Sequence, residues 1–480
     1  MVNGYIPKEQ RKKILLLCDD IRMTSGISTM AREIVLGTAH RFNWINLGGA
    51  INHPEQGKRL DISHDTNKIA GITDSSIFIY PSNGYGSPEV IRQLIEVENP
   101  DAIMFFTDPR YWIWLFQMEN EIRKKIPMIY LNIWDDLPAP LYNKPYYESC
   151  DALMAISKQT HNINKMVLGD KVKDKILKYI PHGINEKAFF PINEFMVEEN
   201  KILEETKKQV FGDFNPEFVV FYNARNIRRK STSDLIAAYA VFCDSIGKEK
   251  ASKCALLLHT QAADENGTDL KVVTELLCDP EYQKVYFSEG RLNTDQINRL
   301  YNIADVTALI SSNEGWGLSL TESMMAGRMI IANVTGGMQD QMRFVDENGK
   351  WIDFDDKFCS NHFGTYKKHG EWAVPVFPTN MSIVGSIPTP YIFDDRCDFR
   401  DVAKAIEKVY DLGPEERSRL GLKAREWVTS DESMMSARKM SENVIDCIEE
   451  TFNTWSPRKN FELIKTEKLP RKKIAHKLIY

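Results

Sequence analysis

Short apolar runs alternate with polar loops and helical patterns along the first part of the chain. Runs typical of buried strands occupy residues 12–18, 77–80, 101–107, 128–134 and 152–156. A helix is expected at about residues 26–39, directly after the first run and a short polar loop. Because strands that alternate with helices form parallel sheets, this part predicts an open α/β domain.

The same alternation returns later in the chain. Further strands are expected at residues 218–224, 254–260, 284–288, 305–310 and 329–332. Residues 193–215, between the two series, are polar and charged, as in a linker or a solvated helix. We therefore expect two doubly wound domains, followed by helices at residues 402–412, 414–428 and 433–455.

Residues 300–342 carry the most informative pattern, which predicts a strand, a loop, a helix ended by Gly327, and a second strand. Glu314 follows the first of these strands, and Glu322 lies on the helix with seven residues between the two. Ligands bind beyond the carboxyl ends of parallel strands, so both carboxylates are expected to face one pocket.

A structural role is the alternative for the same residues. Ser319 and Glu322 form the S-x-x-E pattern of a capping box, in which the glutamate only caps its own helix. Gly315 and Gly317 would then be turn residues.

Two other loops are candidate binding sites for an anion such as a phosphate. Arg225 and Lys230 lie in a basic loop between a strand and a helix, where fixed cations neutralise a diphosphate. The alternative is a solvated charge run before a helix capped by Ser231 or Thr232. Gly26 starts a helix whose free N–H groups suit a phosphate, or it only relieves a tight turn.

Two loops of the first domain are candidates for contact with an acceptor. Trp112 belongs to an aromatic run that would either stack on a sugar or a flipped base, or pack in the core. Asp135 and Asp136 follow a predicted strand and are candidate acceptor contacts.

Length, charge and cysteine content limit the class of protein to which this chain can belong. The chain has 480 residues, 43% of them hydrophobic, which is enough for two packed domains. A net charge of −6 gives no overall basic field for nucleic acid, although residues 458–480 form a locally basic tail. Eight cysteines without a C-x-x-C pair favour reduced thiols. Without an apolar run of membrane-spanning length or a signal peptide, a cytoplasmic protein is expected.

Residues 344–400 form a longer and more irregular segment than a compact second domain requires. They contain an expected short strand at 350–354 and a proline-rich run that ends near residue 398. We expect an ordered insertion that forms part of an acceptor site. The D-x-D at residues 353–355 is interpreted as a surface turn and not as a metal site.

The order strand, E-G-W-G-L at 314–318, second glutamate, strand and Gly-Gly at 336–337 resembles the nucleotide-sugar site of retaining GT-B glycosyltransferases of family four, the glycosyl transferases of group 1. The resemblance implies two Rossmann-like domains facing a cleft, with the last helix crossing back to the first domain. The expected parts are 1–192, a linker at 193–215, a donor domain at 216–430 with its insertion, and a crossing helix and tail at 431–480.

The resemblance also implies roles. Arg225 and Lys230 would hold the diphosphate and stabilise the leaving group, Glu322 would accept hydrogen bonds from the ribose, and Glu314 would lie near the donor sugar. The other expected donor contacts are Gly26, Gly315, Trp316, Gly317, Leu318, Gly336 and Gly337.

The implied activity is retaining, metal-independent transfer of a hexose or pentose from a nucleoside diphosphate sugar, expected to be a UDP-sugar, to a hydroxyl acceptor. No cofactor is implied beyond this co-substrate. The insertion and basic tail also resemble phage enzymes that modify 5-hydroxymethylcytosine, which implies duplex DNA as acceptor and the host cytoplasm as location. The alternatives are a glycan or small-molecule acceptor, and a sugar-nucleotide epimerase or non-catalytic binder on the same fold.

Overall fold

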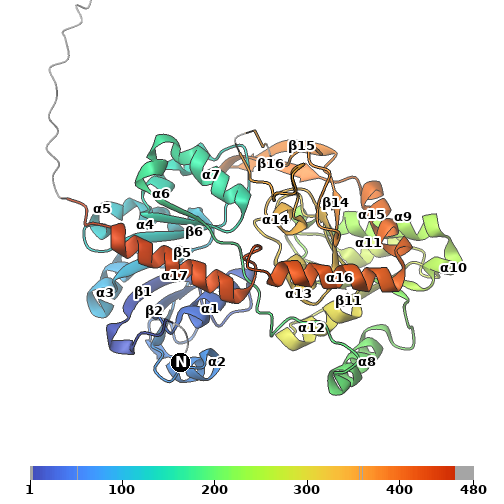
Figure 1. Cartoon of the computed structure of the whole chain (residues 1–480), viewed down its shortest axis with the longest axis horizontal. Helices are drawn as coiled ribbons and strands as arrows, with labels where there is room; N and C mark the ends of the chain where they lie inside the picture. Colours follow the sequence, from blue (N-terminus) through green and yellow to red (C-terminus); the bar gives the residue numbers. More distant parts are fainter. Residues whose placement is uncertain (1–3, 51, 356, 359, 460–480) are drawn as a thin grey trace, which may run out of the picture.

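Two parallel sheets with helices on their faces lie side by side, joined along one side by the last long helices (Figure 1). The structure, a computed structural model, describes residues 4–50, 52–355, 357–358 and 360–459. This arrangement confirms the expected fold of two Rossmann-like domains.

The sheet of the first domain has eight strands in the order β3-β4-β2-β1-β5-β6-β7-β8, and only β3 pairs antiparallel. The strands are β1 (Lys12–Asp19), β2 (Phe42–Gly49), β3 (Leu60–Asp61), β4 (Ile77–Pro81), β5 (Ala102–Phe106), β6 (Met128–Asn132), β7 (Ala152–Ala155) and β8 (Ile176–Tyr179). The helices are α1 (Gly26–Thr38), α2 (Ser63–Ala70), α3 (Pro88–Glu98), α4 (Ile113–Gln117), α5 (Glu119–Ile122), α6 (Lys144–Glu148) and α7 (Lys158–Leu168). All five predicted strands are present.

The sequence pattern missed β2, which is completely buried. Asn43 and Asn46 interrupt its apolar run and make it look like a loop. Asn46 is satisfied inside the core, because it accepts from the backbone N–H of Ile21 (3.1 Å) and donates to the carbonyl of Leu16 (3.3 Å).

The sheet of the second domain has six parallel strands in the order β11-β10-β9-β12-β13-β14. The strands are β9 (Phe218–Asn223), β10 (Cys254–His259), β11 (Lys284–Ser288), β12 (Val306–Leu309), β13 (Met329–Asn333) and β14 (Ala373–Val376). The helices are α8 (Val197–Phe211), α9 (Thr232–Ile246), α10 (Lys248–Ala251), α11 (Leu270–Leu277), α12 (Thr294–Ile303), α13 (Leu318–Met325), α14 (Met338–Met342), α15 (Phe399–Asp411) and α16 (Gly413–Thr429).

The segment expected as a linker contains helix α8. Leu203 and Phe211 on this helix are buried, and Phe211 packs edge-on against Tyr286 of β11. Residues 193–215 therefore belong largely to the second domain.

The insertion at 344–400 is ordered where it is described. It contributes β14 to the sheet and then forms a separate antiparallel hairpin of β15 (Asn380–Ser386) and β16 (Thr389–Arg396). The strand expected at 350–354 is wrong, since Trp351 makes only one isolated bridge there, to Val345.

Helix α17 (Ala437–Thr454) crosses to the first domain and lies against α1, as expected (Figure 1). Gly37 of α1 permits the close approach, because a Cβ there would lie 2.0 Å from the Oγ atom of Ser441. After α17, Arg458 pairs with Glu119 at 2.5 Å, and residues 460–480 of the expected basic tail lie outside the described residues.

Candidate active site

A cavity of about 1270 Å³ lies between the two domains, at the carboxyl ends of their strands. Its walls come from the loops after β1, β5, β6, β9 and β12, and from the hairpin β15–β16. Parallel sheets bind ligands at this edge, and here two such edges face each other.

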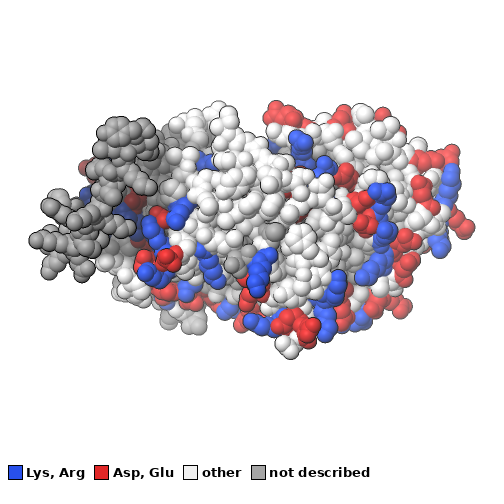
Figure 2. All heavy atoms as spheres, turned by 90° about the horizontal axis from the view of Figure 1, so that it is seen from above, with Lys and Arg blue, Asp and Glu red and all other residues white. Residues whose placement is uncertain are grey.

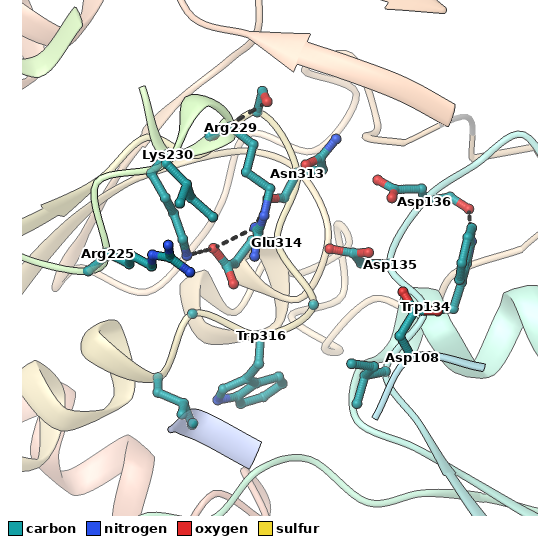
Figure 3. Close-up of a pocket in the computed structure, with 18 of the residues that line it drawn as sticks. Asp108, Trp134, Asp135, Asp136, Arg225, Arg229, Lys230, Asn313, Glu314 and Trp316 are labelled. Atoms are coloured by element: carbon teal, nitrogen blue, oxygen red, sulfur yellow. Dashed lines mark hydrogen bonds and ion pairs between the residues drawn. The ribbon is translucent and has the colours of Figure 1, made fainter. Parts of the chain in front are cut away.

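Glu314 is at the centre of a charged cluster (Figure 3). Its Oε2 atom binds the ammonium group of Lys230 and lies 3.2 Å from the Nη1 atom of Arg229. Arg229 also donates a hydrogen bond of 2.6 Å to the carbonyl of Asn313. The three charged residues meet because β9 and β12, which precede their loops, are neighbours in the sheet.

The electrostatics of this cluster favour an ionised Glu314. Burial alone would raise the pKa of this carboxyl, but the charges of Lys230 and then Arg229 outweigh burial and lower the pKa to about 2. The cluster thus places two cations beside one ionised carboxylate in the wall of the cleft.

Arg225 lies apart from the cluster in this structure, although it was expected to hold the diphosphate. Its side chain lines the rim of the cavity, is 61% exposed, and binds Asp264 at 2.7 Å. Arg229, which was not among the predicted site residues, lies beside Glu314 and Lys230 instead. The sequence has three arginines within residues 225–229, but their spacing does not say which of them lies beside the carboxylate.

Glu322 lies on α13 and faces the same cavity as Glu314, as expected. Tyr301 donates a hydrogen bond of 2.6 Å to its Oε2 atom. Burial raises the pKa of this carboxyl to about 7, against the lowering effect of that hydrogen bond. The capping-box alternative is wrong, because Gly317 is the N-cap of α13 and no side chain caps the helix.

The glycines of the site have two different roles. Gly315 and Gly317 line the cavity, and Gly317 has a φ of +86°. Gly336 and Gly337 pack behind this loop, since a Cβ on Gly336 would lie 2.0 Å from the carbonyl oxygen of Glu314. The expected contact of Gly336 and Gly337 with the donor is therefore corrected, because neither is among the described residues that line the cavity.

Three more predicted donor residues line the cavity. Gly26 and Leu318 approach each other from opposite domains, because a Cβ on Gly26 would lie 3.2 Å from the Cδ1 atom of Leu318. Trp316 is only 1% exposed and donates from its indole N–H to the hydroxyl of Thr321 (2.9 Å), which suits a supporting role beneath the loop.

The first domain contributes carboxylates to the opposite wall. Asp135 and Asp136 line the cavity as predicted and lie across from the cations (Figure 3). Burial raises the pKa of both, and Arg229 partly opposes this effect. The expected acceptor role of Trp112 is wrong, since its side chain is 1% exposed and packs against Phe105 in the core.

Several residues of the wall were not predicted from the sequence pattern. Asp108 and Arg110 after β5 line the cavity, as do Thr389, Ile392 and Asp394 of the hairpin. His182 also lines the cavity, and burial lowers its pKa to about 3, which keeps it neutral. Among the described residues, no group of three or more His, Cys, Asp or Glu is arranged to hold a metal, and no helix is long and apolar enough to cross a bilayer.

Comparisons with known proteins agree with this geometry. Residues 204–357 match the family model for glycosyl transferases group 1. Alpha-monoglucosyldiacylglycerol synthase from Acholeplasma laidlawii is 27% identical over 190 residues, which cover 39% of this chain and 43% of that enzyme. The match thus spans less than half of that relative.

Solved structures extend the similarity to most of the chain. Anabaena HepE, solved with UDP and glucose, has a TM-score of 0.61 at 13% identity and covers 92% of this chain and 100% of its own. Sucrose-phosphate synthase from Thermosynechococcus elongatus has a TM-score of 0.61 at 15% identity, with the same coverage of 92% and 100%. The chain therefore has the GT-B fold, and its region 204–357 is similar to the glycosyl transferases of group 1.

Proposed function

We propose that this protein transfers a sugar from a nucleoside diphosphate sugar to a hydroxyl acceptor, with a UDP-sugar as donor. The observation that carries the proposal is the cluster of Arg229, Lys230 and Glu314 in the cleft between the domains. All three residues lie inside the region that matches the group 1 family model. The similarity in fold to HepE, which was solved with UDP and glucose, supports the choice of donor.

The cations supply the chemistry that the departing diphosphate requires. When the bond to the sugar breaks, negative charge grows on the diphosphate, and the preorganised cations of Arg229 and Lys230 stabilise it. Glu314 holds both cations in place and lies near the donor sugar. Glu322, when ionised, accepts hydrogen bonds from the hydroxyls of the ribose.

We infer retention at the anomeric carbon from the resemblance of the 314–337 region to retaining enzymes. A donor phosphate oxygen then takes the proton of the acceptor hydroxyl, and no protein nucleophile is needed. Because Arg229 and Lys230 provide positive charge beside Glu314, we propose that transfer proceeds without a metal ion.

The acceptor wall favours a neutral hydroxyl compound. Asp135, Asp136 and Asp394 line this part of the cavity beside the Asp108–Arg110 ion pair, and carboxyl groups form hydrogen bonds with hydroxyls in either protonation state. The cations of this wall, Arg110 and Arg396, are already ion-paired and leave little charge for the phosphates of duplex DNA, so we place 5-hydroxymethylcytosine second. The relative's name, a monoglucosyldiacylglycerol synthase, supports a small-molecule acceptor.

Release of nucleoside diphosphate tests the proposal. A panel of UDP-, GDP- and ADP-sugars is incubated with the protein and EDTA, alone and with diacylglycerol, a glycan, or DNA containing 5-hydroxymethylcytosine. Acceptor-dependent release of UDP is expected, and Lys230→Ala should abolish it. A changed sugar nucleotide without an acceptor would indicate an epimerase, and binding without release from any donor would indicate a binder.

A further inference from the structure

Strand β15 and the turn of the β15–β16 hairpin are uncharged and exposed. Residues 373–393 contain no Asp, Glu, Lys, Arg or His. Every residue of β15 is exposed, Ile383 is 67% exposed, and Ile387 in the turn of the hairpin is 99% exposed. Four large apolar side chains, Met381, Ile383, Val384 and Ile387, are exposed on this one hairpin, and grouped exposed apolar residues mark a site of contact with a partner or a membrane, whereas single ones do not.

The same hairpin belongs to the candidate active site. Val384, Ser386, Thr389 and Ile392 line the cavity between the domains. The apolar outer surface is thus continuous with a wall of the cleft. A molecule that leaves the cleft along the hairpin would pass from charged groups to isoleucines.

Hydrogen bonds hold the hairpin across the cleft. The backbone N–H of Phe393 donates to the carbonyl of Leu137 (2.6 Å), and the hydroxyl of Tyr391 donates to the carbonyl of Ala139 (3.1 Å). The hydroxyl of Tyr142 donates in return to the carbonyl of Tyr391 (2.9 Å). The exposed turn is therefore presented from a base that is fixed to both domains.

The chemistry of the hairpin distinguishes between classes of partner. Nucleic acid requires Lys or Arg for its phosphates, and this stretch has none. Addition of a further strand to β15 is disfavoured by the register shift between Val384 and Ser386. A stable protein interface buries roughly 800 Å² on each partner, which is more than two isoleucines on a narrow turn supply.

We propose that the turn of the β15–β16 hairpin inserts Ile387 and Ile383 into the surface of a lipid bilayer, so that a hydroxyl carried by a lipid enters the cleft along the hairpin. A deformable apolar medium suits a narrow protruding turn better than a rigid partner does. The hairpin lies at the top of Figure 1, and Figure 2 shows that few charged side chains occupy the middle of that face. The identity of the acceptor rests on the proposed function, but binding to the bilayer does not.

Flotation of the full chain with phosphatidylcholine vesicles, with and without phosphatidylglycerol, tests the insertion. The protein should float with both kinds of vesicle. Ile387→Ser should lower the partition coefficient by about tenfold or more, since burying one isoleucine side chain is worth that much. The matched control is Leu276→Ser on α11, a residue that is 79% exposed and outside the described lining of the cavity, and it should float like the wild type.

Three results would overturn the proposal. The wild type would stay at the bottom of the gradient, or Ile387→Ser would float as well as the wild type. Alternatively, sedimentation velocity would show a dimer that Ile387→Ser dissociates, which would make the hairpin an interface between two copies. Failure of sugar transfer would be separate, because it would appear as no release of UDP with any acceptor while flotation persisted.

Discussion

The guanidinium of Arg229 lies 3.2 Å from the carboxylate of Glu314 and also donates to the carbonyl of Asn313. One side chain thus joins the loop after β9 to the loop after β12. Arg225, four residues earlier, binds Asp264 at the rim and contacts neither residue in the described contacts. The two arginines of one basic loop therefore differ in burial, partner and expected role.

Replacement of these arginines should separate their roles. Arg229→Ala is expected to lower kcat about 100-fold to 1000-fold, the usual effect of removing one group that stabilises developing charge. Arg225→Ala should change kcat less than about tenfold, since that side chain is exposed and already paired. Release of UDP measures both. A larger loss in Arg225→Ala would place the diphosphate at the rim, next to Asp264.

Glu314→Gln should lower the stability of the fold and increase the stabilisation that a bound anion gives. The substitution leaves the buried Lys230 without its counter-charge, which costs about 3 kcal/mol of unfolding free energy, whereas the half-exposed Arg229 is still solvated. UDP supplies negative charge to the same cations, so it should raise Tm more in the variant than in the wild type. Thermal melts with and without UDP measure this. An equal shift in both proteins would mean that the diphosphate binds elsewhere.

Donor binding should depend on pH through Glu322. Its pKa is raised from 4.5 to about 7, so this group stabilises the fold below pH 4.5, and that contribution is lost as the pH rises through 7. Ribose hydroxyls require the ionised form, so the Kd for UDP should fall about tenfold between pH 6 and 8. Calorimetric titration at several pH values measures it.

The control for this titration is Glu322→Gln, which should remove the pH dependence. Tyr301→Phe deletes the hydrogen bond that favours the ionised form, so its transition should move to higher pH. A pH dependence that persists in Glu322→Gln would assign the titration to another group.

Gly336→Ala should disturb the loop of Glu314. The new Cβ would lie 2.0 Å from the carbonyl oxygen of Glu314 on a backbone with a φ of +53°, so both strain and overlap oppose it. Gly349→Ala has a similar φ of +81° but nothing within 4 Å. Chemical denaturation should show a loss of about 1 kcal/mol for Gly349→Ala and at least twice that for Gly336→Ala. Equal losses of unfolding free energy in the two variants would show that the loop of Glu314 moves to accommodate the new methyl group.

Continuous apolar runs explain why most strands were predictable. β1, β5 and β13 are buried on both faces, so their sequences read as uninterrupted hydrophobic segments. β2 was not predicted because asparagines interrupt its apolar run. Asn46 finds its hydrogen-bond partners only in the folded sheet. The edge strand β3 has two residues, which is too short for any periodicity.

The sequence predicted which types of residue form the candidate site, but not which of their side chains face the cavity. Glu314, Glu322 and Lys230 line the cavity because they follow strands or start a helix at one edge of the sheet. The inward turn of Arg229 depends on the 3-10 turn at Arg228–Lys230, which local spacing does not specify. The hairpin joins the site through contacts with residues 137–142, more than 200 positions away, and no local pattern encodes such contacts.

Helix α17 has a consequence for how this protein is made. It packs on α1, and Arg41 and Glu449, 408 positions apart, form an ion pair across that contact. While a ribosome is still synthesising the second domain, the face of α1 that receives α17 has no partner. The first domain, although it leaves the ribosome first, is therefore the last to be completed, and a nascent chain that stalls before residue 437 leaves this face of α1 uncovered.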